Sequence, residues 1–365
     1  MANPSGKSRL ARIISQIEND EGPDRAVLKA GYGRLSELRM IGLTGPPGAG
    51  KSSLVDGLVA GWAGRGLRAA VLAIDPSSPF SGGAMLGDRI RMHRAEAFDS
   101  VFIRSVAARG HPGGLAAAVP DICVALAAFG FDRVAIETVG AGQNDVAIKD
   151  QADSIVVVSV PGLGDSMQAI KAGTMEIGDV YVVNKADTPG ADRTASDIRT
   201  VIELAHDSLD RSQGTDGGPA RRARGAQILE ARHGAGGGES CWRPPVVMAT
   251  ATEEGGAAEL AAAIERHLAW SEASGRLHNR RIVMLRAQLQ QRLAQALLGE
   301  LGAAPYEEAD QLAYWARRIA ASEVLPEDAV KATLEAFRFS PSSPAGVERR
   351  KLSRVGRRKE QELEP

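Results

Sequence analysis

Short apolar runs recur along this chain and alternate with longer stretches in which apolar residues follow a helical spacing. The strand-like runs cover residues 40–44, 69–74, 101–106, 133–137, 155–160, 179–183 and 245–250. Short buried runs separated by helices are typical of parallel strands that are covered on both faces. The pattern therefore predicts an α/β fold, with a mostly parallel sheet and helices on both of its faces.

Helical periodicity is clear between residues 8 and 21, where Leu10, Ile13, Ile14 and Ile17 fall on one face. Further helices are expected at 53–62, 115–129, 191–209, 257–268 and 280–298, with one or two more between 306 and 339. In the helix at 280–298, leucines recur at every fourth position, namely Leu285, Leu289, Leu293 and Leu297. Such a stripe either packs against its own chain or forms a dimer interface.

These elements divide the chain into four parts. We expect an N-terminal helical segment at 1–37, a main domain at 38–270 and a C-terminal helical region at 271–339. Residues 340–365 form a basic tail that we expect to be disordered and solvated. Residues 211–240 are rich in Gly and Arg and lack apolar periodicity, so we expect a flexible insertion in the main domain.

The most informative motif follows the first apolar strand and precedes a helix. It reads Gly45-Pro46-Pro47-Gly48-Ala49-Gly50-Lys51-Ser52 and fits the phosphate-loop pattern G-x-x-x-x-G-K-[ST]. In this context, loop N–H groups and a helix N-terminus bind polyphosphate, which predicts a P-loop NTPase sheet. We expect Lys51 to reach the β- and γ-phosphates and the Ser52 hydroxyl to bind Mg²⁺. The other expected nucleotide-binding positions are Gly45, Pro46, Gly48, Ala49, Gly50 and Ser53.

A second motif indicates which base is bound. Asn184-Lys185-Ala186-Asp187 follows a β-branched strand, in the form N-K-x-D that selects guanine in GTPases. A carboxylate at Asp187 can accept both adjacent donors of guanine, and adenine has no such pair. Lys185 would lie along the base and Asn184 would tie this loop to the phosphate loop. The predicted ligands are GTP and GDP.

Three acidic residues are candidates for contact with Mg²⁺, either directly or through water. Asp75 follows the strand at 69–74, Asp88 lies in a Gly-rich stretch, and Glu137 ends the strand at 133–137. Glu137 begins a Glu-x-x-Gly sequence whose Gly140 N–H would meet the γ-phosphate. Asp75 could instead be a helix N-cap before Pro76, and Asp88 a solvated loop charge.

Together these motifs resemble one family, the GTPase chaperones of B12-dependent acyl-CoA mutases. These are the bacterial MeaB type and its mitochondrial counterpart, and some members also carry the name arginine/ornithine transport kinase. Most GTPases of other branches have Asp-x-x-Gly where this chain has Glu-x-x-Gly. The matching stretches are Gly45–Ser52, Asp75–Asp88, Ile103–Ala116, Glu137–Gln143, Pro161–Lys171, Asn184–Asp187 and Trp242–Val246.

The resemblance implies a homodimer that binds an adenosylcobalamin-dependent acyl-CoA mutase. GTP hydrolysis would then gate cofactor loading and the removal of damaged cofactor. It also implies a nucleotide-sensitive segment at 161–171, in which Asp165 and Lys171 are catalytic candidates. Lys171 would stabilise transition-state charge, or would be an ordinary exposed helix lysine. The backbone of Thr250 and Ala251 would contact guanine O6, although the family tends to have Ser-Ala or Ser-Gly there.

Composition restricts the binding partners, the location and the cysteine chemistry that we expect. The formal net charge is −1, so the whole chain presents no field for nucleic acid or membrane. No apolar stretch is long enough to span a bilayer and no signal sequence is apparent, so we expect a cytoplasmic protein. Cys123 and Cys241 lie far apart and indicate neither a disulfide framework nor zinc, and Cys123 is expected to be a core residue.

The sequence leaves two other functions open. A metallochaperone GTPase for a nickel enzyme would share the sheet and the Glu-x-x-Gly motif, but it usually needs a Cys/His metal site. The six histidines of this chain form no cluster in the sequence. An ATP-dependent kinase of a small molecule or transport protein would not need Asp187. Base preference separates the kinase from the GTPase, and bound nickel or zinc would identify the metallochaperone.

Overall fold

The structure is a computed structural model, and it describes most of the first 302 residues. The described residues are 4–19, 21, 24–76, 92–108, 118–138, 148–162, 177–212, 233, 241–251 and 254–302, with Trp315, Arg318, Asp328 and Ala332. The chain separates into two compact units, Met1–Gln288 and Leu289–Pro365. In the second unit, the Arg318 guanidinium lies 5.9 Å from the centroid of the Trp315 ring.

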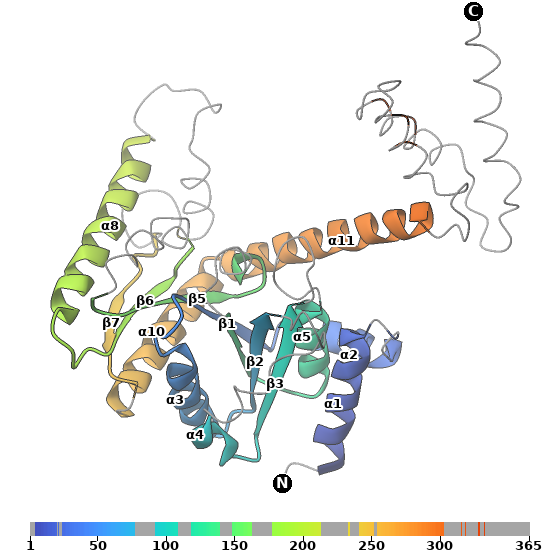
Figure 1. Ribbon diagram of the computed structural model, residues 1–365, viewed down its shortest axis with the longest axis horizontal. Helices are drawn as coiled ribbons and strands as arrows, with labels where there is room; N and C mark the ends of the chain where they lie inside the picture. Colours follow the sequence, from blue (N-terminus) through green and yellow to red (C-terminus); the bar gives the residue numbers. More distant parts are fainter. Residues whose placement is uncertain are drawn as a thin grey trace, which may run out of the picture. The chain divides into compact units, whose positions relative to one another are not determined.

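The first unit is built around a seven-stranded sheet in which each pair of neighbours is parallel (Figure 1). Its strand order is β3-β2-β4-β1-β5-β6-β7. The strands are β1 (Arg39–Thr44), β2 (Ala69–Pro76), β3 (Val101–Ala108), β4 (Arg133–Glu137), β5 (Ser154–Ser159), β6 (Val180–Asn184) and β7 (Val246–Ala249). The predicted α/β class and all seven predicted strands are confirmed, with ends that differ by one or two residues.

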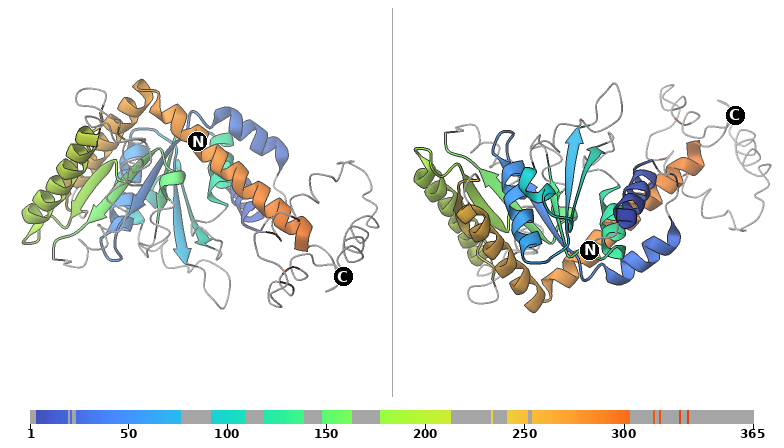
Figure 2. Two further views of the ribbon diagram at one scale, coloured as in Figure 1. Left: turned by 90° about the horizontal axis from the view of Figure 1, so that it is seen from above. Right: turned by 90° about the horizontal axis from the view of Figure 1, so that it is seen from below.

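Helices cover both faces of this sheet (Figure 2). The described helices are α1 (Pro4–Glu18), α2 (Arg25–Arg34), α3 (Lys51–Gly64), α4 (His93–Glu96), α5 (Val119–Ala128), the 3₁₀ turn η2 (Ile148–Asp150), α8 (Ala191–Ser212), α10 (Glu254–Ala273) and α11 (Arg276–Gly302). Buried apolar residues of α1, α5 and α8 belong to one cluster, and buried apolar residues of α3, α4 and α10 belong to a second. The sequence pattern did not predict the short helices α2 and α4.

The apolar residues of α1 explain why it packs on the sheet. Leu10, Ile13, Ile14 and Ile17 are all buried in the first cluster, as their spacing predicted. Cys123 of α5 lies in the same cluster, which confirms it as a core residue. Burial raises the pKa of the Cys123 thiol to about 12, with smaller contributions from the negative charges of Asp153 and Asp121.

Two buried aspartates connect the amino ends of the strands to helix α11. Asp153 precedes β5 and accepts a hydrogen bond from Met40 N at 2.9 Å. Arg281 of α11 donates to both Asp153 carboxylate oxygens, at 3.1 and 2.9 Å, and to the carbonyls of Leu35 and Leu38. These bonds fix the start of α11 at the amino edge of the sheet.

The second aspartate, Asp179, gathers residues that are distant in the sequence. His233 Nε2 lies 3.2 Å and His267 Nε2 3.5 Å from Asp179 Oδ1, and Arg280 Nη1 lies 3.4 Å from Oδ2. Trp242 Nε1 donates to the Asp179 carbonyl at 2.8 Å. His233 belongs to the 211–240 stretch that was expected to be flexible, yet its side chain is fully buried. The rest of that stretch after Ser212 lies outside the described residues.

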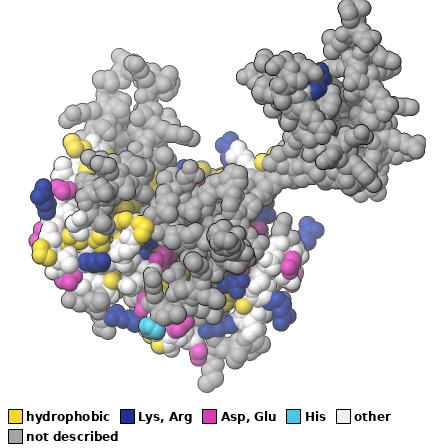
Figure 3. All heavy atoms as spheres, in the orientation of Figure 1, with side chains coloured by type: hydrophobic (Ala, Val, Ile, Leu, Met, Phe, Trp, Pro, Cys, Tyr) yellow, Lys and Arg dark blue, Asp and Glu magenta, His cyan; other side chains and the backbone are white. Residues whose placement is uncertain are grey.

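The histidines are not clustered in the sequence, but His233 and His267 both lie close to Asp179 in the fold. Even so, the described residues contain no group of three His, Cys, Asp or Glu side chains placed to hold a metal ion. None of the described helices has the length and apolar character needed to cross a membrane. On the face shown in Figure 3, acidic and basic side chains of the described residues are interspersed.

Candidate nucleotide site

The site lies at the carboxyl edge of the sheet, where β1 leads into the phosphate loop and then into α3. β1 pairs with β4 on one side and β5 on the other, so the order in which the strands are added to the sheet reverses here. Ligands of open α/β sheets bind at such a point. Leu43 of β1 pairs with Glu137 of β4, which places this acid beside the loop.

Two glycines in the loop are required by its backbone. Gly45 has φ +144° and Gly50 has φ +81°. Residues with a side chain rarely adopt such positive φ values. A Cβ at Gly45 would lie 2.1 Å from the Val158 carbonyl oxygen, and one at Gly50 would lie 2.3 Å from Asn184 Nδ2. A side chain at Gly45 would therefore clash with the backbone of β5, and one at Gly50 would displace the Asn184 amide group.

Helix α3 presents an N-terminus suited to anions. Gly50 is its N-cap and provides no side-chain cap, and the first turn contains no acidic residue. The partial positive charge of the first turn is therefore not neutralised locally. Lys51 begins the helix and is 6% exposed, and its Nζ donates to the carbonyls of Gly45 and Pro46 at 2.8 and 3.0 Å. The phosphate loop thus has both the Lys51 ammonium group and the N–H groups of the α3 N-terminus beside it.

Ser52 and Glu137 provide two oxygen ligands on the same side of the loop. The Ser52 hydroxyl donates to Glu137 Oε1 at 2.7 Å, and Glu137 is 7% exposed. Thr138 holds the end of β4 in place, since both its N–H and its hydroxyl donate to the Leu43 carbonyl, at 3.1 and 3.3 Å. A hydroxyl beside a carboxylate is a hard oxygen donor set, which fits Mg²⁺.

Of the remaining metal and catalytic candidates, the structure describes only Asp75. Asp75 lies in β2, two residues beyond Ala73, which pairs with Glu137 across the sheet. Because Asp75 and Pro76 belong to a strand, the alternative of a helix N-cap at Asp75 is wrong. Asp88, Gly140, Asp165 and Lys171 lie outside the described residues.

Asn184 connects the phosphate loop to the loop after β7. It ends β6 and is 1% exposed. Its Nδ2 donates to the Ala49 carbonyl at 2.7 Å, and its Oδ1 accepts from Ala251 N at 3.1 Å. One side chain thus brings together the loop at 45–52 and the predicted guanine-side residues Thr250 and Ala251.

Lys185 and Asp187 are held in a turn that leaves both side chains exposed. Lys185 has φ +55°, a left-handed backbone that costs of order 1 kcal/mol for a residue with a side chain. Its carbonyl accepts from Thr188 N at 2.9 Å and from the Thr188 hydroxyl at 2.6 Å. Sequence reasoning missed Thr188, although a hydroxyl residue one place after N-K-x-D is a turn signal.

Comparison with known proteins agrees with this geometry. The family model described as "Methylmalonyl Co-A mutase-associated GTPase MeaB" matches residues 10–305, which is most of the chain. The chain belongs to the MeaB family of GTPases. It is therefore an enzyme that binds guanine nucleotide and hydrolyses GTP, as the motifs predicted.

Individual relatives of this MeaB-family chain support the assignment. A putative GTPase of Pyrococcus abyssi is 44% identical over 271 residues, 74% of this chain and 75% of that protein. The "Methylmalonic aciduria type A homolog, mitochondrial" of Caenorhabditis briggsae is 38% identical over 157 residues, 43% of this chain and 38% of that protein. The solved structure of a "LAO/AO transport system kinase" has a TM-score of 0.57 at 21% identity, covering 93% of this chain and 99% of that one. This last likeness confirms the fold.

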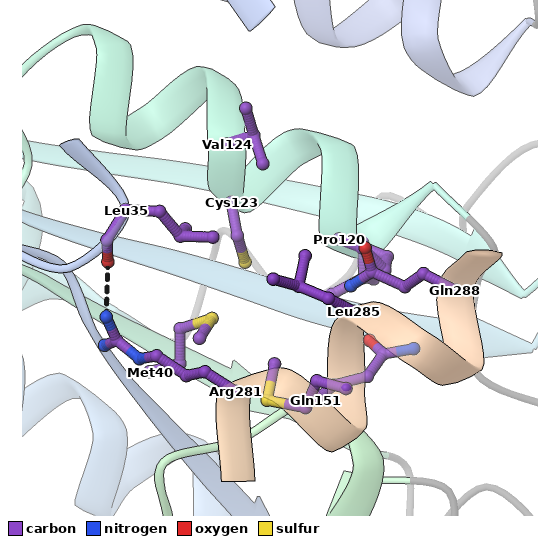
Figure 4. Close-up of a pocket in the computed structure, with 11 residues that line it drawn as sticks. Leu35, Met40, Pro120, Cys123, Val124, Gln151, Arg281, Leu285 and Gln288 are labelled. Atoms are coloured by element: carbon purple, nitrogen blue, oxygen red, sulfur yellow. Dashed lines mark hydrogen bonds between the residues drawn. The ribbon is translucent and has the colours of Figure 1, made fainter. Parts of the chain in front are cut away.

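A small cavity of this MeaB-family protein lies away from the nucleotide site (Figure 4). Its lining includes Leu35, Met40, Cys123 and Leu285, with Arg281 at one side. Met40 lies near the amino end of β1, whereas the phosphate loop follows the carboxyl end of the same strand. The Arg281 guanidinium is already bonded to Asp153 and to the Leu35 carbonyl, so this cavity belongs to the packing of α5 and α11.

Proposed function

We propose that this GTPase acts in the cytoplasm as a chaperone of an adenosylcobalamin-dependent acyl-CoA mutase. In this proposal, GTP hydrolysis gates the loading of adenosylcobalamin and the removal of damaged cofactor. The observation that carries the proposal is the family match across residues 10–305, whose description names a methylmalonyl-CoA mutase-associated GTPase. The Caenorhabditis briggsae relative, named for methylmalonic aciduria, supports the same class of client.

The site supports hydrolysis that depends on Mg²⁺. The donors Ser52 Oγ and Glu137 Oε1 would hold the ion, with Asp75 and Asp88 as further candidates. Bound Mg²⁺ would neutralise charge on the β- and γ-phosphate oxygens. Lys51 would exchange its two loop carbonyls for phosphate oxygens, which are better acceptors for an ammonium group. The loop and helix N–H groups would orient the nucleotide at the same time.

Three further residues complete the proposed reaction. The Gly140 N–H would bind the γ-phosphate, and Lys171 would stabilise the charge that develops during hydrolysis. Asp165 would act with Lys171 in the 161–171 segment, which the family resemblance links to nucleotide and partner. These roles rest on the sequence motifs Glu137–Gln143 and Pro161–Lys171.

We also propose a homodimer formed through α11. Ile282, Leu289 and Leu293 lie on one helical face, at positions i, i+7 and i+11, and are 52%, 68% and 58% exposed. Large apolar side chains repeated along one face of a helix are typical of a surface that a partner covers.

The test is GTP hydrolysis by the purified protein with and without an acyl-CoA mutase encoded in the same genome. We expect a higher rate with the mutase and no stimulation of ATP hydrolysis. Transfer of adenosylcobalamin to the apo-mutase, followed spectroscopically, should require hydrolysable GTP. Lys51→Ala should abolish turnover, whereas Lys29→Ala, which changes an exposed lysine of α2, should behave as wild type. Turnover that is indifferent to every such mutase would refute the chaperone role and leave the GTPase assignment intact.

A further inference from the structure

Lys185 has an unusual backbone conformation at the end of β6. Among the described residues, it is the one residue other than glycine with a positive φ, at +55°. Residues with side chains rarely adopt this left-handed conformation, and those that do are concentrated at active sites and ligand clamps. Lys185 lies between the buried Asn184, which bonds to the phosphate loop, and the expected base-binding residue Asp187. The path of the chain from β6 to Asp187 therefore depends on this conformation.

Thr188 stabilises this conformation through two hydrogen bonds to a single acceptor. The Lys185 carbonyl oxygen accepts from Thr188 N at 2.9 Å and from the Thr188 hydroxyl at 2.6 Å. Threonine hydroxyls commonly bond to carbonyls three or four residues earlier in the chain, and these bonds favour one local backbone conformation over its competitors. The two bonds close residues 185–188 into a turn, and Asp187 lies within this turn, directly before Thr188.

The residues on either side of Asp187 are both anchored. On one side, Ala186 N donates to the Ala249 carbonyl of β7 at 3.0 Å, which ties the turn to the neighbouring strand. On the other side, Thr188 bonds to the Lys185 carbonyl as described. Thr188 also precedes a proline, which restricts its own backbone to extended conformations. The Thr188 hydroxyl thus acts on a segment that otherwise has few ways to relax.

Selection of guanine by a carboxylate requires accurate placement of that carboxylate. Guanine presents two adjacent donors, and both carboxylate oxygens must accept from them to distinguish guanine from adenine. Hydrogen bonds weaken steeply as their angles depart from linear, so a displaced carboxylate loses part of this distinction. The Asp187 side chain is exposed, so its placement depends on the backbone of the turn rather than on side-chain packing.

We propose that Thr188 is a positioning residue for guanine selection, acting through the left-handed backbone of Lys185. This inference rests on the proposed role of Asp187 in binding the base. The bonds that Thr188 makes end at Lys185, whereas the phosphate loop is held by bonds from Lys51 and Asn184. Removal of the Thr188 hydroxyl should therefore weaken recognition of the base and leave the binding of the phosphates unchanged.

The experiment measures the affinities for GDP and ADP by competition against a ribose-labelled fluorescent GDP. Thr188→Val removes the hydroxyl and keeps the shape, and it should lower GDP affinity by about 3- to 10-fold with ADP affinity unchanged. Thr188→Ser keeps the hydroxyl and should restore the wild-type ratio of GDP to ADP affinity. Thr200→Val is the matched control, since the exposed Thr200 hydroxyl donates to the Ser196 carbonyl at 3.0 Å within α8. It should bind both nucleotides as wild type does.

A wild-type ratio of GDP to ADP affinity in Thr188→Val would overturn the inference. So would an equal loss of both affinities, because that pattern describes general destabilisation, or an equal loss in Thr188→Ser and Thr188→Val. If Thr188→Val does not fold, Thr188→Ala provides the same comparison.

Asp187→Asn in the same assay separates two failures. A lowered ratio in Asp187→Asn beside an unaltered ratio in Thr188→Val would remove only the role of Thr188. Unaltered ratios in both variants would remove the base-selecting role of Asp187 as well.

Discussion

At the residue scale, the described nucleotide site consists of side chains that bond to one another across separate segments. Lys51 bonds to two loop carbonyls, Ser52 to Glu137, and Asn184 to both Ala49 and Ala251. The identities of these residues were readable from short motifs, because each motif requires a particular functional group at a fixed spacing. The contact of Asn184 with the phosphate loop was also expected from its motif, whereas the bond between Ser52 and Glu137, which are 85 positions apart, was not.

Asp187 is expected to select the base. Asp187→Asn replaces one of the two carboxylate acceptors for guanine by a donor, so GTP affinity should fall by about 10- to 100-fold. Discrimination against ATP should fall with it. Competition binding of GTP and ATP measures both effects. Asp192→Asn, an exposed acid in the first turn of α8, is the control and should leave both affinities unchanged. Unaltered discrimination in Asp187→Asn would remove its assigned role.

Cys123 is expected to be unreactive in the folded protein. Its pKa is raised to about 12 by burial, so the thiolate that reacts is scarce at pH 8. A thiol reagent at pH 8 should modify the half-buried Cys241 first and Cys123 only after denaturant is added. Because the unfolded thiol ionises near 9 and the folded one near 12, stability should fall as pH rises from about 9 to 12.

The stability comparison has an internal control in Cys123→Ala. This variant lacks the titrating thiol, so the part of the alkaline loss that comes from Cys123 should be absent from its unfolding curves. Denaturant unfolding of both proteins at pH 8 and pH 10 provides the measurement. Equal losses of stability in the two proteins would show that Cys123 does not titrate differently on unfolding.

At the element scale, two short helices that the sequence pattern did not predict join the predicted elements. Helix α4 is four residues long, too short for a periodicity signal, and its cap comes from Asp56 of α3. Helix α2 has weak amphipathicity in its sequence, and among its residues only Val27 and Gly31 are buried. By contrast, α1 and α8 were predictable because their apolar residues repeat on one face.

Helix α11 gives a prediction at this scale. Arg281 forms a two-oxygen ion pair with Asp153, which is fully buried, and Arg281→Met would leave that carboxylate without its cation. Removing one partner of a buried pair typically costs about 3–5 kcal/mol of folding free energy. Denaturant unfolding should show this loss. Arg286→Met, at an exposed position of the same helix, should change stability by less than about 0.5 kcal/mol.

At the scale of the whole molecule, the open question is assembly. The exposed apolar residues of α11 predict that two chains associate, and Leu289→Glu with Leu293→Glu should prevent association by placing charge in an apolar contact. Sedimentation velocity of wild type and the double variant measures this. Gln290→Glu adds a charge at a neighbouring exposed position and should leave the dimer intact. A monomeric wild type, or an unaffected double variant, would contradict the dimer.

The sequence by itself determined the strands, the parallel fold class and the nucleotide chemistry of this protein. Those features depend on local periodicity and on motifs whose residues are adjacent, such as Gly45–Ser52 and Asn184–Asp187. Only the tertiary structure decided which distant groups meet. Asp179 gathers His233 and His267, Asp153 holds Arg281, and Asp56 caps α4, because burying a charge requires partners wherever the fold places them.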